Sequence, residues 1–436
     1  MNRMKMAEGI AMRILREGSE GSDVMELQST LRKLGYYSEA PDRTFGPEMK
    51  QAVIKFQTWR SIAPDGIVGP ETWRALWPFL LGYDTYFIQP GDTFYEIGKK
   101  YGTDPQLIAA ANPGLSPEHL MPGTKITVPY SYDVVTTDAG YTHEVLMRNI
   151  EGLKARYPSL AVGTIGKSVL GKSLYALRLG RGENRVAYNA AHHALEWITS
   201  PVLMKFAEDS LKACALKQPL DGYDMQKLWT DSSVWLVPMV NPDGVDLVID
   251  GLSRNNPYYD RLIQWNGGSS DFSQVWEANI RGVDLNHNYN AAWEQSKQAE
   301  ESLGITGPGP TRYSGPYPVS EPETRAMVSF TRSRKIRLAM AYHAQGSVIY
   351  WNFQNLASPE AKEIGENLSR ISGYSLEEAS GVASYAGYKD WYIQEFRDPG
   401  YTIEVGYGKN PLPISEFPQI YAENIGMLLY AATVQH

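Results

Sequence analysis

The stretch "RVAYNAAHHALEW", residues 185–197, decides the fold of the longest part of this chain. Its first seven residues are mostly apolar and have the length of a buried strand, and two histidines follow at once. Apolar runs of similar length recur at residues 233–240, 336–343, 347–351 and 401–406, and amphipathic helical patterns such as 143–158 and 320–334 lie between runs of this kind. This alternation predicts an α/β domain with a central sheet between helices and functional groups at the strand ends.

The histidine pair contains candidate metal ligands. His193 precedes Glu196 by three residues and His192 precedes it by four, and both spacings place side chains on one face of helical backbone. Spacing alone therefore does not choose between them. A catalytic zinc site takes a third protein ligand, and of the seven histidines in the chain His287 and His343 remain as distant candidates. His343 ends a strand run, where a rigid element can present a ligand.

Composition limits the other classes of function. A chain of 436 residues exceeds what one hydrophobic core organises, so we expect several domains. A net charge of -8 argues against affinity for nucleic acid or anionic membranes, and no protein partner is evident. No secretory signal and no membrane-spanning run is visible, so we expect a cytoplasmic protein, with wall association as the alternative if a signal is missing.

Residues 13–79 contain an internal repeat. The segments "PDRTFGPEM" and "PDGIVGPET" begin at residues 41 and 64, and each is a turn that leads to a proline at a helix start. Helical patterns lie between and before them, which predicts a small all-α bundle. These motifs resemble the peptidoglycan-binding domain type 1, and the alternative is a helical bundle without wall affinity.

Residues 86–130 predict the order strand, helix, helix, strand, with Thr93 as a helix cap. The opening "PGDT" and the closing "LMPGTKITVP" resemble a LysM domain, a βααβ module that binds N-acetylglucosamine units of glycans. The resemblance implies a glycan-binding groove near Gly91, Asp92 and Thr93. Residues 131–140 are polar and read as a linker.

Residues 141–436 resemble the zinc carboxypeptidases of the M14 peptidase family. Its zinc motif H-x-x-E-W is met by "HALEW", and "VNPDG" (240–244), "GVDLNHNY" (282–289), "SEPET" (320–324) and "YTIEVG" (401–406) follow in family order. The resemblance implies a multidomain chain that ends in an α/β carboxypeptidase-like domain with a central mixed sheet. It also implies one zinc ion with the ligands His193, Glu196 and His343.

The resemblance assigns two further roles near the metal. Asp284, the aspartate of "GVDLN", is expected to accept a hydrogen bond from the second ring nitrogen of His193 and to hold that ring in place. Glu404 is expected to be the general base, which takes a proton from the attacking water and passes it to the leaving amine.

The sequence departs from the family at substrate-binding positions. The family binds a terminal carboxylate with the asparagine and arginine of "N-R-N", whereas this chain has Asn286 followed by His287, which weakens selection for a free C-terminus. The family's carbonyl-polarising arginine after a tryptophan is replaced by Glu277, and Arg281 is the nearest substitute. For the tyrosine of the substrate loop, an ungapped count reaches Val382, and Tyr385 lies three residues later.

Lys389, in "GYKDW", occupies the position that lines the base of the family's specificity pocket, where a cation favours a carboxylate-bearing side chain. The alternative is a lysine directed to solvent. With the wall-binding modules, these departures resemble the γ-D-glutamyl-meso-diaminopimelate (γ-D-glutamyl-L-diamino acid) endopeptidases, which cut peptidoglycan stem peptides. The alternatives are a conventional zinc carboxypeptidase and a non-catalytic wall-binding protein.

Overall fold

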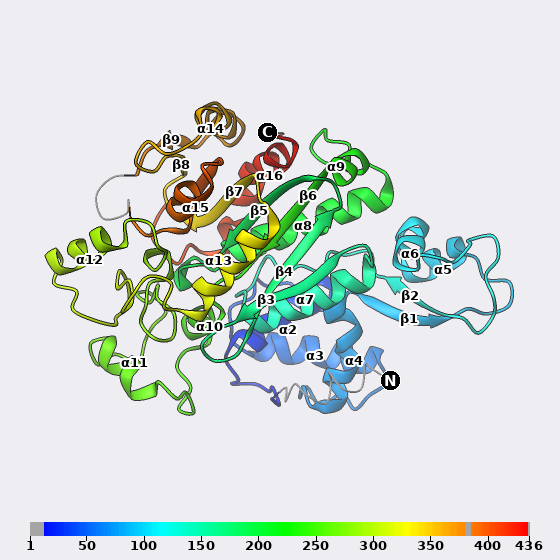
Figure 1. Cartoon of the computed structure of the whole chain (residues 1–436). Coiled ribbons are helices and arrows are strands. Elements are labelled where there is room, and N and C mark those ends of the chain that lie inside the picture. Colours follow the sequence, from blue (N-terminus) through cyan, green and yellow to red (C-terminus); the bar gives the residue numbers. More distant parts are fainter. Residues whose placement is uncertain (1–12, 380–384, 435–436) are drawn as a thin grey trace. The chain divides into compact units, whose positions relative to one another are not determined.

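The computed structural model describes residues 13–379 and 385–434, which divide into two compact units (Figure 1). One unit contains the residues up to 140 together with 144–158, and the other contains 141–143 and the residues from 159 onward. Helix α7 (His143–Arg156) belongs to the first unit from Glu144, because its buried Arg148 forms an ion pair with Glu26. The domain boundary predicted at residue 141 stays a prediction.

The N-terminal helices form the predicted bundle. They are α2 (Ser22–Lys33), α3 (Pro47–Trp59) and α4 (Pro70–Leu81), and the last two begin with the prolines of the repeated segments. The repeat is also structural. The side chain of Gln28 donates to Asp42 at 2.7 Å, and the side chain of Gln57 donates to Asp65 at 2.9 Å. Each buried glutamine thus holds the turn before the next helix.

The LysM segment has the predicted order, with β1 (Tyr83–Phe87), α5 (Phe94–Tyr101), α6 (Pro105–Ala111) and β2 (Lys125–Pro129). The two strands pair antiparallel, from Tyr83 opposite Pro129 to Phe87 opposite Lys125. Thr93 caps α5 by accepting a hydrogen bond from the Glu96 N–H at 3.1 Å, as predicted. The strand starts three residues before the predicted segment.

The second unit is built on an eight-stranded sheet in the order β3-β4-β6-β5-β7-β10-β8-β9 (Figure 1). The strands are β3 (Ala161–Lys167), β4 (Ser173–Gly180), β5 (Asn184–Ala190), β6 (Ser232–Val237), β7 (Leu338–Ala344), β8 (Val348–Tyr350), β9 (Ser375–Glu377) and β10 (Gly400–Val405). The neighbours β6, β5, β7 and β10 are mutually parallel, whereas β4 and β8 run antiparallel to them. The sheet is mixed, as predicted.

Helices cover both faces of this sheet. On one face Ala187 of β5 shares a buried cluster with Met327 of α13 (Pro322–Arg334) and Trp391 of α15 (Tyr388–Phe396). Tyr188, the next residue and therefore on the other face, packs on Phe206 of α8 and donates to the Leu428 carbonyl of α16 at 2.8 Å. The predicted fold class is confirmed.

The helices of this unit are α8 (Thr199–Leu216), α9 (Met225–Asp231), α10 (Pro242–Asp250), α11 (Tyr259–Trp265), α12 (Trp293–Ser302), α13 (Pro322–Arg334), α14 (Pro359–Ser372), α15 (Tyr388–Phe396) and α16 (Phe417–Thr433). No helix within the described ranges is both long enough and apolar enough to cross a bilayer. Because four neighbouring strands are parallel, their carboxyl ends share one edge of the sheet, and the candidate site lies at that edge.

Candidate metal centre

The end of β5 turns sharply and delivers the first two candidate ligands. Ala191 has a left-handed backbone (φ 52°), and its N–H donates to the Thr199 hydroxyl at 3.0 Å. The chain then enters a short 3-10 helix, Ala194–Glu196, directly after His193. The three-residue spacing places the His193 Nδ1 atom 2.9 Å from Glu196 Oε1.

His343 adds the third candidate ligand from the neighbouring strand β7. Its Nδ1 atom lies 2.8 Å from Glu196 Oε2 and 3.3 Å from His193 Nδ1. The ligand atoms of His193, Glu196 and His343 all lie within 4.8 Å of one another. The structure therefore brings together the three ligands predicted from the sequence, one from each of two strand ends and one from the turn.

The contacts among these atoms fit a cation. A neutral His193 that donates to Asp284 through Nε2 has a lone pair at Nδ1. That lone pair faces the Glu196 carboxylate oxygen and the His343 ring, an arrangement that a cation between them would stabilise. Although burial lowers it, the charges of Glu196 and Asp284 raise the pKa of His193 well above its ordinary value. The site thus favours positive charge where the three ligand atoms converge.

The wider surroundings are rich in carboxylates. Besides Glu196 and Asp284, they include Glu277 and Glu404, whose charges interact with each other and with His193. Within the described part of the chain, no lysine or arginine forms an ion pair with any of these four acids. A divalent cation would supply the missing positive charge, and two imidazoles with one carboxylate are a zinc ligand set.

His192, the other member of the pair, points to a different partner. It is fully buried, and its Nε2 atom lies 2.9 Å from the Tyr289 hydroxyl. Its ring stacks on that of His343 at 5.6 Å between centroids. Burial lowers the pKa of His192 well below its ordinary value, so it is a neutral neighbour that supports the His343 ring.

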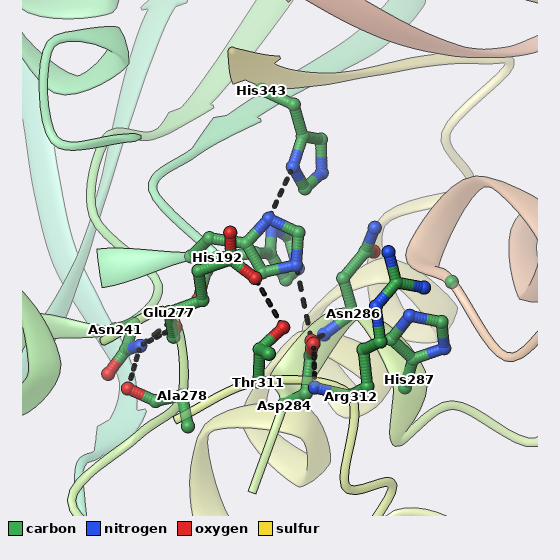
Figure 2. Close-up of polar contacts among 12 residues, drawn as sticks. His192, Asn241, Glu277, Ala278, Asp284, Asn286, His287, Thr311, Arg312 and His343 are labelled. Carbon is green, nitrogen blue, oxygen red and sulfur yellow. Dashed lines mark hydrogen bonds and ion pairs between the residues drawn. The ribbon is translucent and has the colours of Figure 1, made fainter. Parts of the chain in front are cut away.

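Asp284 links His193 to the following loop (Figure 2). Its Oδ1 atom lies 3.1 Å from His193 Nε2, and its Oδ2 atom accepts the Arg312 N–H at 2.9 Å. Although burial alone would raise it, the charges of His193 and His287 hold the pKa of Asp284 well below the usual range. An ionised carboxylate in this position can hold the His193 ring in one orientation, and the role expected for Asp284 stays a prediction.

Replacement of Asp284 with Asn should weaken zinc binding by about 10- to 100-fold, because the amide carries no charge to hold the His193 ring. Competition with a chelating dye would measure the affinity of the purified full chain. The matched control is Asp231→Asn, which removes an acid paired with Lys227 on α9. Equal zinc affinity in the Asp284 variant and the parent would contradict this role.

Glu404 lies on β10 directly beside His343, since the two residues are partners in the parallel ladder. Burial and the charge of Glu196 raise the pKa of Glu404 well above its ordinary value. A carboxylate with a raised pKa beside a metal site suits proton transfer to and from a reacting group.

The zinc carboxypeptidase family, Peptidase M14, matches residues 146–426, which include the three converging ligands. The chain belongs to this family. The N-terminal part of the chain matches a peptidoglycan binding domain at residues 20–76 and a LysM domain at residues 86–129.

Two relatives share most of this family domain. The γ-D-glutamyl-L-diamino acid endopeptidase 1 of Lysinibacillus sphaericus is 44% identical over 299 residues, which cover 69% of this chain and 74% of the relative. The protein YqgT of Bacillus subtilis is 35% identical over 291 residues, 66% of this chain and 76% of its own length. Bovine thrombin-activatable fibrinolysis inhibitor, solved with tick carboxypeptidase inhibitor, shares the fold, with a TM-score of 0.51, 19% identity, and coverage of 68% of this chain and 97% of its own.

Arg281, the residue expected to polarise the scissile carbonyl, contacts residues other than the three ligands. Arg281 donates to the Tyr258 hydroxyl at 3.3 Å and lies 3.6 Å from Glu321, with 43% of its side chain exposed. Among the described residues it makes no contact with the three ligands. Glu277, which follows the tryptophan, accepts a hydrogen bond from the Thr311 hydroxyl beside the site (Figure 2). The catalytic role of Arg281 stays a prediction.

Asn286 and His287 follow Asp284 on a short 3-10 helix and lie beside the site (Figure 2). The side-chain amide oxygen of Asn286 (Oδ1) accepts the Tyr388 N–H at 3.0 Å, which leaves the side-chain N–H groups as donors. His287 is buried, and its Nδ1 atom lies 3.3 Å from the Ser296 hydroxyl. Their substrate-binding roles stay predictions.

The two remaining pocket residues have different surroundings. Lys389 is buried rather than directed to solvent, and its ammonium group contacts the Asn352 carbonyl and the Asp390 carboxylate, each at 2.7 Å. Tyr385 is partly buried, next to Ala386, whose backbone is bonded to Tyr289 and Ala291. Val382, the other candidate for the loop tyrosine position, lies outside the described residues.

The predicted glycan-binding residues occupy the turn before α5. Gly91 has a left-handed backbone (φ 87°), and Asp92 accepts the Gln89 N–H at 2.7 Å. The Thr93 hydroxyl accepts from Glu96, so it can still donate to a ligand. Glycan binding by this turn stays a prediction.

Sequence reasoning missed one residue at the site. Arg312 is bonded through its backbone to Asp284, and its side chain extends toward the side on which Asn286 and His287 lie (Figure 2). It lies 28 residues after Asp284, in a loop without periodic pattern, so no sequence signal linked the two.

Proposed function

We propose that this protein is a zinc-dependent endopeptidase that hydrolyses the γ-D-glutamyl-diaminopimelate bond of peptidoglycan stem peptides. The observation that carries the proposal is the 44% identity to a γ-D-glutamyl-L-diamino acid endopeptidase over 74% of that relative's length. The converging His193, Glu196 and His343, with Glu404 beside them, supply the groups that such a hydrolysis needs.

One zinc ion held by these three residues would polarise the scissile carbonyl and make a water nucleophilic at neutral pH. Asp284 holds the His193 ring in position. Glu404 accepts the proton of the attacking water and donates it to the departing amine of the diamino acid. Carbonyl recognition by Arg281 and side-chain recognition by Lys389 would require each to leave its present partner, Glu321 and Asp390 respectively.

The N-terminal domains support the same substrate. A peptidoglycan binding domain and a LysM domain on one chain would hold the peptidase near its polymer and raise its effective concentration there. We infer that stem peptides attached to glycan strands are substrates. The cytoplasmic location expected from the sequence stays a prediction, which fractionation of the producing cells would check.

A tetrapeptide stem, in which one residue follows the diamino acid, separates the candidate functions. We expect mass spectrometry to find the dipeptide that contains the diamino acid and the last residue. Release of the last residue alone would identify a conventional carboxypeptidase. Intact peptide, with no stoichiometric zinc by elemental analysis, would identify a non-catalytic wall-binding protein.

A further inference from the structure

Arg312 has a backbone that the site itself holds in place. Its φ is 66°, in the left-handed region, and its N–H donates to Asp284 Oδ2 at 2.9 Å. In return the Asp284 N–H donates to the Tyr313 carbonyl at 2.8 Å. These two hydrogen bonds fix the backbone of Arg312 beside the Asp284 carboxylate, which contacts His193.

The charge of Arg312 is uncompensated. Its side chain is exposed, and no acid among the described residues forms an ion pair with it. The other cations expected to recognise substrate are already paired, because Lys389 contacts Asp390 and Arg281 lies near Glu321. Arg312 is therefore, within the described residues, a cation beside this site that is free to meet an incoming anion.

The direction of the side chain agrees with a binding role. In Figure 2 the guanidinium group points to the same side as the Asn286 amide and the His287 ring. The Asn286 amide retains its two N–H donors, since its oxygen is bonded to the Tyr388 N–H. A planar guanidinium with further donors nearby matches the geometry of a carboxylate.

We infer that Arg312 binds a carboxylate of the substrate next to the scissile bond and determines the preference for acidic stem peptides. The inference rests on the proposed function. A stem tripeptide has three candidate carboxylates, namely the α-carboxylate of the glutamyl residue and the two carboxylates of the diamino acid.

The test is a set of double-mutant cycles between Arg312 and each substrate carboxylate. The parent enzyme and Arg312→Gln are assayed on the tripeptide and on three analogues, each with one carboxylate converted to an amide. We expect Arg312→Gln to lower kcat/KM on the tripeptide by about 10- to 100-fold, as for loss of a hydrogen bond between charged groups. The analogue that has lost the bound carboxylate should be cut equally well by both enzymes, and Arg312→Lys should restore part of the loss.

Zinc content and melting temperature should not change in Arg312→Gln, because the bond to Asp284 comes from the backbone. The matched control is Arg185→Gln, at the opposite end of β5 from His193, which should behave as the parent. An equal loss on all four peptides, or no loss on any, would overturn the role of Arg312. If the parent enzyme instead trims ordinary C-terminal residues, the proposed function fails, and the same cycle on acid and amide forms of that peptide still tests Arg312.

Discussion

Glu404→Gln should lower kcat for release of the diamino acid by about 10²- to 10⁴-fold, the contribution of a positioned general acid and base. Glutamine has nearly the same shape as glutamate, but its amide cannot accept the proton of the attacking water. Glu404 is not one of the three converging ligands, so the variant should retain its zinc. Initial rates on a defined stem tripeptide, together with elemental analysis, measure both quantities.

The matched control for this variant is Glu377→Gln, which changes a glutamate on β9 at the edge of the same sheet. It should retain the parent rate. Unchanged turnover in Glu404→Gln would remove this residue from the mechanism, and loss of zinc together with activity would point to a role in metal binding instead.

His193→Gln should weaken zinc binding by more than about 100-fold, beyond the usual effect of residues that only support a ligand. His192→Gln should change it by less than about 10-fold, because His192 contacts Tyr289 and supports the site only through packing. Zinc titration of both variants, each with its melting temperature, compares two adjacent residues of the same type.

The melting temperature separates folding from metal binding in this pair. His192 is fully buried, so its replacement should lower the stability of the protein even where zinc affinity is retained. If His192→Gln loses zinc as readily as His193→Gln, the assignment of the ligand within the pair is wrong.

The secondary structure of the peptidase domain followed from its sequence in part. The apolar runs led to β5, β6, β7, β8 and β10, because buried strands need continuous apolar residues. The strands β3, β4 and β9 were not anticipated. In β3 most residues are exposed or partly exposed and the ladder to β4 shifts between Thr164 and Gly166, so its strand character comes from pairing with a neighbour rather than from an apolar pattern.

The candidate metal centre was predictable because its ligands stand in a recognisable local pattern. His193, Glu196 and the strand-terminal His343 could be recognised from their neighbouring residues and their order in the sequence. The structure places their ligand atoms together. The substrate side was less predictable. Lys389 was expected to offer a charge to substrate, yet Asp390 and a backbone carbonyl already occupy its ammonium group.

The sequence by itself determined which modules this chain has, the family of its peptidase domain and the residues eligible to hold a metal. The modules and the family followed from motifs that resemble those of known families, and the eligible ligands followed from local spacing. Only the tertiary structure decided that His192 turns to Tyr289 while His193 turns to Glu196, and that Arg312 stands next to Asp284 with its charge free. The physical reason is that the contacts of His192 with Tyr289 and of Arg312 with Asp284 join residues distant in the chain, and local spacing does not specify such partners.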